Sequence, residues 1–325
     1  MRARLRVFPA LLILVLTASV AAFPAMAADN QGHFDRTLTV TGPVDLDVQT
    51  GAGDITVRSG DSTHVEIHAK IRAGLWSGSD QQIHEIENNP PIEQKGNTIR
   101  VGHIENQDLL RHISISYEVI VPADTKLHAE SGSGEQKAEG ISGPVDAVSG
   151  SGGIRLKTIG GEASVRTGSG EIELDTIHGT THASTGSGTI QAIGIAGGLN
   201  ASSGSGKVKL EQVSGGDVEI STGSGSVEIK GVKGAAKVST GSGSITAQGD
   251  PTGNWRLRTA SGNVTADFPP QAAFEVVAHT SSGNIRSAHE ISVQGTITSH
   301  ELRGKVGGGG SLVELTTSSG NIEIR

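Results

Sequence analysis

The sequence predicts an all-β fold: a parallel β-solenoid (β-helix-like) of two-stranded coils about 18 residues long, with an irregular β-rich section at its amino-terminal end. Three observations predict it: a recurring Ser/Thr-Gly-Ser-Gly tetrapeptide, alternating aliphatic residues after it, and a second glycine that closes each repeat. The last glycine of the tetrapeptide returns every 18 or 19 residues, at Gly134, Gly152, Gly170, Gly188, Gly206, Gly225 and Gly243. So short a unit is too small for a helix pair or a propeller blade, and it buries its apolar face only against neighbouring copies.

The residues after each tetrapeptide have the two-residue period of a β-strand. Ile172 and Leu174 alternate with Glu171, Glu173 and Asp175, which places the aliphatic side chains on one face. Corresponding aliphatic residues stand two positions after the glycine of the other repeats, at Ile154, Ile190, Val208, Val227, Ile245, Val264 and Ile285. A third aliphatic column is followed two residues later by glycine, at Ile141, Ile159, Ile177, Ile195, Val213 and Val232. Each coil is therefore predicted to have two strands and two glycine turns.

Residues 1–27 are predicted to be a secretory signal peptide. Arg2, Arg4 and Arg6 precede an apolar run from Val7 to Ala22, and Ala25-Met26-Ala27 forms a small-residue cleavage site. A membrane anchor is the alternative, but the apolar run is short for a bilayer span. We expect export through the secretory pathway to the periplasm, the cell surface or the medium.

Residues 28–122 are predicted to form an amino-terminal β-rich section that contains a first coil and an insertion. We expect a coil over 33–58, a strand over 65–71, a helix over 79–87, a turn at 95–97 and a strand over 113–121. The irregular part of this section is expected to cover the amino-terminal end of the solenoid, because exposed strand edges invite pairing with other chains.

Residues 123–325 are predicted to be the repeat solenoid. The period continues in altered form at Gly262, Gly283 and Gly320, and the last gap of 37 residues is close to two periods. The chain ends on a strand, Ile322–Arg325, with no shielding segment after it. We expect either an earlier loop such as 287–305 or another chain to cover that end, so end-to-end self-association is one expected outcome.

The chain also resembles a known bacterial family. The stretch Tyr117–Leu127, the tandem coils, the Gly307–Gly310 run and the closing Leu315–Ile324 are similar to the β-strand-repeat family called "putative adhesins" (domain of unknown function 4097). The resemblance covers about residues 40–325. It implies an exported bacterial β-solenoid, but it names no receptor and supplies no catalytic residues.

Composition restricts the classes of partner. The chain has 47 glycines, no cysteine and eight aromatic residues, which excludes a disulfide scaffold. Removing the leader leaves 23 basic against 34 acidic residues and a net charge of −11 with histidines neutral. An acidic surface without basic runs disfavours nucleic acid and anionic lipid. No segment after the leader is predicted to span a membrane.

No metal or cofactor site is predicted. His64 and His68 lie on a predicted strand, which separates their imidazoles by about 13 Å, too far to share one ion. His178 and His182 are loosely spaced around a turn. A calcium-binding roll needs aspartate after the glycine turn, and only Asp54 and Asp217 approach that pattern.

Hydroxyl residues form two regular columns around the tetrapeptide. Three residues before its last glycine stand Ser149, Thr167, Thr185, Ser203, Thr222, Thr240, Thr259, Thr280 and Thr317. One residue before it stand Ser151, Ser169, Ser187, Ser205, Ser224, Ser242, Ser261, Ser282 and Ser319. We interpret the columns as a turn ladder in which hydroxyl groups bond to the backbone of neighbouring coils. A flat Thr-x-Ser array that binds ordered water or a polymer is the alternative.

The functional hypothesis is a non-catalytic, exported β-solenoid that acts as an adhesin-like binding surface or a cell-envelope scaffold for an unknown envelope or surface ligand. It is not predicted to be an enzyme, and no catalytic, cofactor-binding or metal-binding residue is assigned. A polysaccharide-active solenoid enzyme is the alternative; it needs paired carboxylates, whereas Glu171, Glu173, Glu219 and Glu228 alternate outward as solvated charge.

An ice- or surface-binding solenoid is the second alternative. Binding of sugar rings by aromatic stacking is weakly supported, because Trp76, Trp255, Tyr117 and three phenylalanines are the aromatic residues after the leader.

Overall fold

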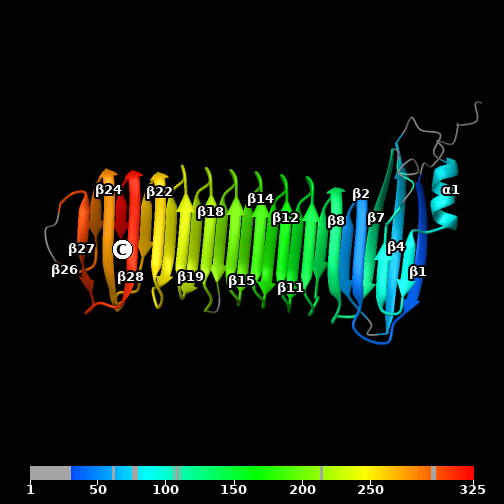
Figure 1. The fold of residues 1–325 in the computed structure, drawn as a ribbon, viewed down its shortest axis with the longest axis horizontal. Helices are drawn as coiled ribbons and strands as arrows, with labels where there is room; N and C mark the ends of the chain where they lie inside the picture. Colours follow the sequence, from blue (N-terminus) through cyan, green and yellow to red (C-terminus); the bar gives the residue numbers. More distant parts are fainter. Residues whose placement is uncertain are drawn as a thin grey trace, which may run out of the picture.

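Two long β-sheets face each other along an elongated solenoid (Figure 1). The computed structural model describes residues 31–60, 63–74, 80–104, 106, 110, 112–212, 215–293 and 298–325. The proposed leader, Trp76 and Val213 lie outside these described residues. Within the described residues, 29 strands form one sheet of 14 strands, here called sheet A, and one of 15 strands, here called sheet B.

The spatial order of the strands differs from the chain order only near the two ends. Sheet A runs β1 Gln31–Thr39, β4 His64–Ala73, β7 Ile113–Val121, β3 Ile55–Ser59, β9 Gln136–Glu139, β11 Ile154–Ile159, β13 Ile172–Ile177, β15 Ile190–Ile195, β17 Val208–Gln212, β19 Val227–Lys233, β21 Ile245–Asp250, β23 Val264–Asp267, β29 Ile322–Ile324 and β25 Ile285–Ser287. Sheet B runs β26 Ser292–Val293, β27 Glu301–Val306, β24 Phe274–Ser282, β28 Ser311–Ser319, β22 Trp255–Ser261, β20 Ala236–Thr240, β18 Val218–Thr222, β16 Leu199–Ser203, β14 Thr181–Thr185, β12 Ala163–Thr167, β10 Val145–Ser149, β8 Lys126–Ser133, β2 Asp45–Ala52, β6 Thr98–Val101 and β5 Ile92–Lys95.

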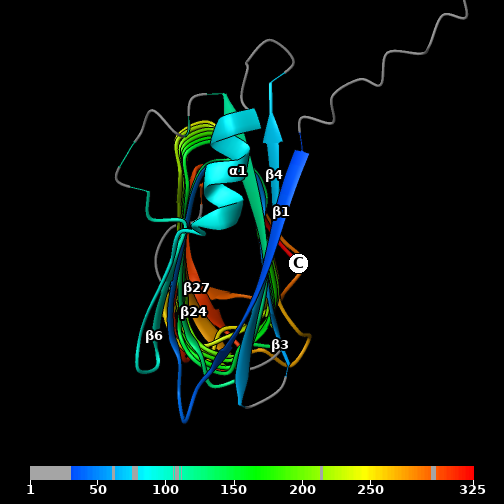
Figure 2. The same cartoon turned by 90° about the vertical axis from the view of Figure 1, so that its right-hand side faces the viewer.

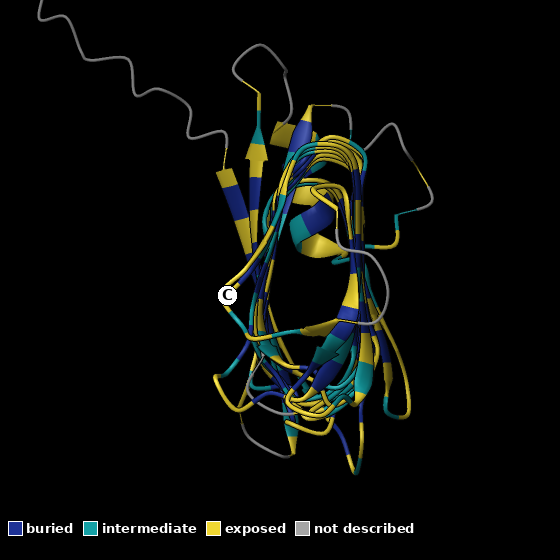
Figure 3. Cartoon of the chain, turned by 90° about the vertical axis from the view of Figure 1, so that its left-hand side faces the viewer, coloured by how far each residue is buried: buried dark blue, intermediate teal, exposed yellow. Residues whose placement is uncertain are grey.

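The predicted all-β, parallel solenoid is confirmed. Strands one coil apart pair in parallel, so that Ile154 lies beside Ile172 and Ile172 beside Ile190. These side chains are fully buried, as are the corresponding leucine and alanine columns. The end-on views show the two sheets facing each other across a narrow interior (Figures 2 and 3), and buried residues alternate with exposed ones along the strands (Figure 3). The alternation read from the sequence therefore sets which side chains enter the core.

Each coil has two different turns. The tetrapeptide turn joins a sheet B strand to the next sheet A strand, and it lies along the upper edge in Figure 1. The opposite turn, here called the isoleucine turn, buries the third aliphatic column, with Ile159 and Ile177 completely enclosed. Just before this column the backbone enters the left-handed region, at Gly140, Thr158, Thr176, Gly194 and Gly231. Glycine accepts that conformation freely, whereas threonine is strained by it.

The amino-terminal section adds an outer coil, made of β6 and β7, outside the coil made of β2 and β3. Strands β2 and β3 pair with β8 and β9 on one side and with β6 and β7 on the other. Beyond this outer coil, β4 and β1 add antiparallel strands to sheet A, and β5 adds one to sheet B. The predicted strands over 65–71 and 113–121 are β4 and β7, and the predicted helix is α1, Asp80–Asn88. This section covers the end of the solenoid, as predicted (Figure 2).

The carboxyl-terminal end is closed by an earlier part of the same chain. Strands β28 and β29 insert beside β22 and β23, and the preceding coil, β24 and β25, packs outside them. Strand β27 then adds to β24 in antiparallel fashion. The predicted covering by an earlier segment is confirmed, and this segment extends beyond 287–305 to include β24. None of the helices in the described part of the chain has the length and apolar character of a bilayer span.

Candidate functional site

The threonine column lies inside the tetrapeptide turn. The hydroxyl group of Thr185 accepts a hydrogen bond from the N–H of Gly188 at 3.0 Å and donates one to the carbonyl of Gly170, in the preceding coil, at 3.0 Å. The same two bonds recur around Thr167 and Thr240. The predicted turn ladder is therefore confirmed for this column, in which each hydroxyl group bonds to the backbone of its own coil and of the preceding one.

The serine column behaves differently. Ser151, Ser169, Ser187, Ser205 and the later members of the column are exposed at the tip of the turn. Because the threonine hydroxyl groups point inward, the two columns do not form a flat Thr-x-Ser surface. In the alternative interpretation both columns bind ordered water or ice, but only the serine column is exposed to do so.

The predicted metal candidates make other contacts. Asp54 Oδ1 accepts the N–H of Glu135 at 2.9 Å, and Asp217 Oδ1 accepts the N–H of Ala235 at 3.2 Å. Both aspartates thus cap the start of a strand in the next coil. His68 Nδ1 lies 2.6 Å from Asp35 Oδ1 and His178 Nδ1 lies 3.3 Å from the carbonyl of Ile159.

His64 lies beside Thr63, with its Nδ1 2.8 Å from the threonine Oγ1, and His182 Nε2 lies 3.9 Å from Glu162 Oε1. Over the described residues, no group of three or more histidine, aspartate or glutamate side chains is arranged to hold a metal ion.

Several outward carboxylates are paired with basic residues on a neighbouring coil or on the same strand. Hydrogen bonds from Lys207 and Lys230 to Glu228 lower the pKa of this carboxyl from 4.5 to about 2. A hydrogen bond from Arg155 likewise lowers the pKa of Glu173. A glycosidase acid needs the opposite shift, toward neutral pH. These side chains are therefore suited to holding coils in register, and they are poor proton donors.

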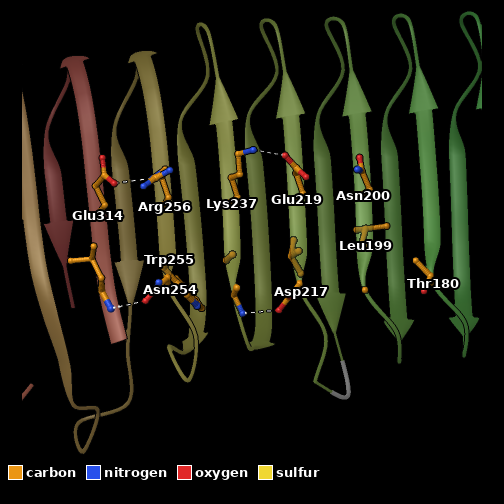
Figure 4. A pocket seen from close by; sticks show the side chains of 15 residues that line it. Thr180, Leu199, Asn200, Asp217, Glu219, Lys237, Asn254, Trp255, Arg256 and Glu314 are labelled. Atoms are coloured by element: carbon orange, nitrogen blue, oxygen red, sulfur yellow. Dashed lines mark hydrogen bonds and ion pairs between the residues drawn. The ribbon is translucent and has the colours of Figure 1, made fainter. Parts of the chain in front are cut away.

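A shallow groove lies on the outer face of sheet B, near the carboxyl-terminal half of the solenoid (Figure 4). Its volume is about 540 Å³, within the range of small-molecule sites. We call it the sheet B groove; it is lined by Thr180, Gly198, Leu199, Asn200, Asp217, Val218, Glu219, Ala235, Ala236, Lys237, Asn254, Trp255, Arg256, Leu312 and Glu314. It crosses β16, β18, β20, β22 and β28.

Ion pairs and amides border one side of the groove. Lys237 lies 2.6 Å from Glu219, and Arg256 lies 2.8 Å from Glu314 (Figure 4). Arg258 also contacts Glu314 and, as the largest influence, lowers the pKa of this carboxyl. Asn200 continues the same row at the other end of the groove (Figure 4). Two carboxylates and three basic side chains thus meet along this border, and each of them takes part in an ion pair.

The other border is formed by the residues that directly precede β16, β18, β20 and β22, together with Leu312 near the start of β28. Asn254 Oδ1 accepts the N–H of Leu312 at 3.1 Å, in the same manner as Asp217 with Ala235. Gly198 and Ala235 stand at equivalent positions. Because they have little or no side chain, the border of the groove projects less from the sheet at these two positions. Leu312 is 37% exposed, one of two large hydrophobic residues exposed in the described part of the chain.

The sequence did not predict this groove. Trp255 lies beside Val313, 58 residues later, so β22 and β28 meet only because the last coil inserts before its predecessor. The one signal in the sequence is a small residue at two of the positions that directly precede the strands, Gly198 and Ala235, where other coils have Glu162, Thr180 or Asp217. That signal marks a gap on the surface without saying what borders it.

Comparison with curated proteins gave no match. Among solved structures, a "putative cell adhesion protein" from Clostridium sporogenes is 13% identical, covers 90% of this chain and 98% of its own, and has a TM-score of 0.24. A "putative adhesin" from Bacteroides fragilis is 14% identical, covers 90% of this chain and 97% of its own, and has a TM-score of 0.33. The family model described as Toastrack DUF4097 matches residues 44–325, nearly the whole solenoid, and the chain therefore belongs to the Toastrack DUF4097 family.

Proposed function

We propose that the mature chain is an exported, non-catalytic β-solenoid that acts as an adhesin-like binding surface or scaffold in the bacterial cell envelope. The observation that carries this proposal is the sheet B groove, an open depression on the face of a rigid, fully paired sheet. Its borders are held by ion pairs and strand-capping bonds, so it presents a fixed surface to a partner.

Export is supported by the leader. Residues 1–27 have the features of a secretory signal peptide: three arginines, an apolar run and a small-residue cleavage site. Because the chain has no cysteine, an oxidising compartment would neither form nor break a disulfide bond in it. We propose that the mature chain begins at Ala28 and resides in the periplasm, on the cell surface or outside the cell.

The pairing of the carboxylates supports a non-catalytic role. Glu219 and Glu314 border the groove, yet each is bonded to a lysine or an arginine. A polysaccharide-cleaving solenoid would need one such group held protonated near neutral pH. If Glu219→Gln and Glu314→Gln variants lost a measurable hydrolytic activity of the wild-type chain, the enzyme alternative would replace this proposal.

A binding experiment tests the proposed function directly. The labelled chain from Ala28 to Arg325 is incubated with envelope fractions of the producing bacterium, and retention is measured by sedimentation at increasing protein concentration. We expect saturable retention that unlabelled chain displaces. Retention that is absent, or that grows linearly without displacement, contradicts a specific envelope surface. Mass spectrometry of the exported chain checks cleavage after Ala27.

A further inference from the structure

We propose that the sheet B groove binds a neutral, unbranched glycan chain that lies along the solenoid axis. This inference rests on the proposed function, because it names the chemistry of the envelope component that the surface would recognise. Three properties of the groove lead to a neutral polyhydroxylated ligand: its charge balance, the saturation of its backbone, and the polar groups that remain without partners.

The first property is charge balance. Three acidic side chains, Asp217, Glu219 and Glu314, and two basic ones, Lys237 and Arg256, line the groove. Arg258 lies next to it and contacts Glu314, so the formal charges of these six side chains sum to zero. Five of these six are already joined in ion pairs. A strongly charged polymer would gain little there and would have to break those pairs, whereas a neutral ligand leaves them in place.

The second property is the saturated backbone. The groove lies on the face of sheet B, where the strands from β16 to β28 are each paired on both sides. An extended peptide obtains much of its affinity from backbone bonds to an open sheet edge. Among the strands that the structure describes, no such edge borders the groove, so side chains must supply the recognition.

The third property is the set of polar groups that remain free. Within the described residues, no hydrogen bond occupies the amide of Asn200, the Nδ2 of Asn254 or the hydroxyl of Thr180, although all three line the groove. These short neutral donors and acceptors suit sugar hydroxyl groups. Ala235 and the exposed Leu312 provide apolar contact for the carbon face of a sugar ring.

The shape of the groove gives the orientation. It crosses five adjacent strands, which at about 4.8 Å per strand extends roughly 19 Å along the solenoid. The groove is long along the solenoid axis and only as deep as its bordering side chains. A linear chain fits this shape better than a compact molecule does. The regular spacing of the strands repeats similar contacts along it.

Calorimetry with defined sugars tests the inference. The probes are unbranched hexasaccharides of glucose, mannose, galactose and N-acetylglucosamine, with a hexagalacturonate as the acidic comparison. We expect at least one neutral probe to bind, the acidic probe to bind at least tenfold more weakly, and Ala235→Tyr, which fills the groove, to weaken neutral binding at least tenfold. Asn200→Ala should also weaken it severalfold.

Ser164→Tyr is the matched control. Ser164 points outward from sheet B in register with Asn200 but two strands away from it, outside the groove. Its tyrosine variant should bind as the wild type does, and circular dichroism should show that both tyrosine variants are folded. Equal binding by wild type and Ala235→Tyr, or no binding of any neutral probe, overturns the inference.

The envelope experiment separates this failure from failure of the proposed function. If no hexasaccharide binds but Ala235→Tyr still reduces envelope retention, the groove binds a different class of molecule, such as a peptide, and only the glycan inference fails. If no hexasaccharide binds and retention is also intact in Ala235→Tyr, the glycan inference fails, and the retention that remains belongs to a surface other than the groove. If the wild-type chain is not retained at all, the proposed function itself fails.

Discussion

Two adjacent glycines, Gly152 and Gly153, show how closely successive coils approach in the tetrapeptide turn. A Cβ added to Gly152 would lie 1.7 Å from the carbonyl oxygen of Gly134, whereas one added to Gly153 would meet its nearest neighbour at 3.4 Å. The first distance is impossible without moving backbone, and the second is ordinary contact. Close packing of the coils, rather than a special backbone angle, therefore requires glycine at position 152.

We expect Gly152→Ala to lower the free energy of unfolding by about 3 kcal/mol, the upper end of overpacking costs, because the clash is with backbone. Gly153→Ala is the control and should change it by no more than about 0.5 kcal/mol. Urea unfolding followed by circular dichroism measures both. Similar costs for the two variants would contradict the packing argument.

The threonine column gives a second prediction at this scale. Thr185→Val keeps the shape of the side chain but leaves the N–H of Gly188 and the carbonyl of Gly170 without their partner. We expect a loss of about 3 kcal/mol, since each buried unpaired group carries a desolvation cost. Thr185→Ser should recover most of it, and the exposed Ser187→Ala should be nearly neutral. Thermal melting of the three variants checks this order.

Two threonines adopt a backbone conformation that costs stability. Thr158 has a φ of 55° and Thr176 a φ of 59°, where the equivalent coils have Gly140, Gly194 and Gly231. A left-handed β-branched residue costs about 1 to 2 kcal/mol, which exceeds the entropic cost of glycine.

We therefore expect Thr176→Gly to raise the free energy of unfolding by about 0.5 to 1 kcal/mol. Thr246→Gly is the control, because Thr246 is an exposed residue inside β21 with an ordinary backbone, and there glycine should destabilise. Differential scanning calorimetry of both variants decides the question. A lower melting temperature for Thr176→Gly would show that the threonine is not strained.

At the scale of the strands, charged residues fix the register between coils. On sheet A, Arg155 lies between Glu135 and Glu173, and the pairs at 2.8 and 2.5 Å join three consecutive coils. A slip of one residue would point the charges inward and the aliphatic column outward. The ion pairs add little energy individually, but they agree with the hydrophobic pattern in selecting one alignment.

The Glu228 pair gives a pH prediction. Its pKa in the folded chain is about 2, below the ordinary 4.5, so the pair stabilises the folded state above pH 4.5 and this contribution is lost as the pH falls toward 2. We expect Glu228→Gln to melt slightly below wild type at pH 7, by about 0.5 kcal/mol, and the difference to vanish by about pH 2. Melting curves from pH 7 to pH 2 test it. A difference that stays constant with pH would exclude the ion pair as its source.

At the scale of the whole molecule, side chains protect the open edge of β1. Glu87 of α1 accepts the N–H of His33 at 2.9 Å, and Gln94 of β5 donates to the carbonyl of Thr39 at 2.9 Å. The guanidinium group of Arg36 covers the carbonyl of Asp35. These bonds occupy one N–H and two carbonyl groups of β1 that would otherwise be available to a strand of another molecule.

We expect the mature chain to sediment as a monomer, and the double variant Glu87→Ala/Gln94→Ala to self-associate with increasing concentration while keeping its melting temperature. Glu85→Ala, an exposed change on the same helix, is the control. Analytical ultracentrifugation at several concentrations measures the effect. Self-association of the wild-type chain would instead support end-to-end stacking, the other outcome expected from the sequence.

The regular coils could be predicted from the sequence because each coil repeats one local requirement. The alternation of Ile172 and Leu174 with charged residues sets the inward face, and the glycine spacing sets the length of the coil. The tetrapeptide also predicted the hydroxyl ladder, since Thr185 needs only its own coil and the preceding one to make its bonds. Interactions between adjacent coils can therefore be predicted from the amino-acid sequence alone.

The order of coils at the two ends and the sheet B groove were decided only by the tertiary structure. Strand β2 pairs with β8 and β22 pairs with β28, although long segments separate them in the chain. Nothing local selects these partners; they are chosen because the ends must bury their last apolar faces and protect their strand edges. The sequence by itself therefore determined the repeating coil, whereas closure of the ends, and the surface that this closure creates, depended on which distant strands could meet.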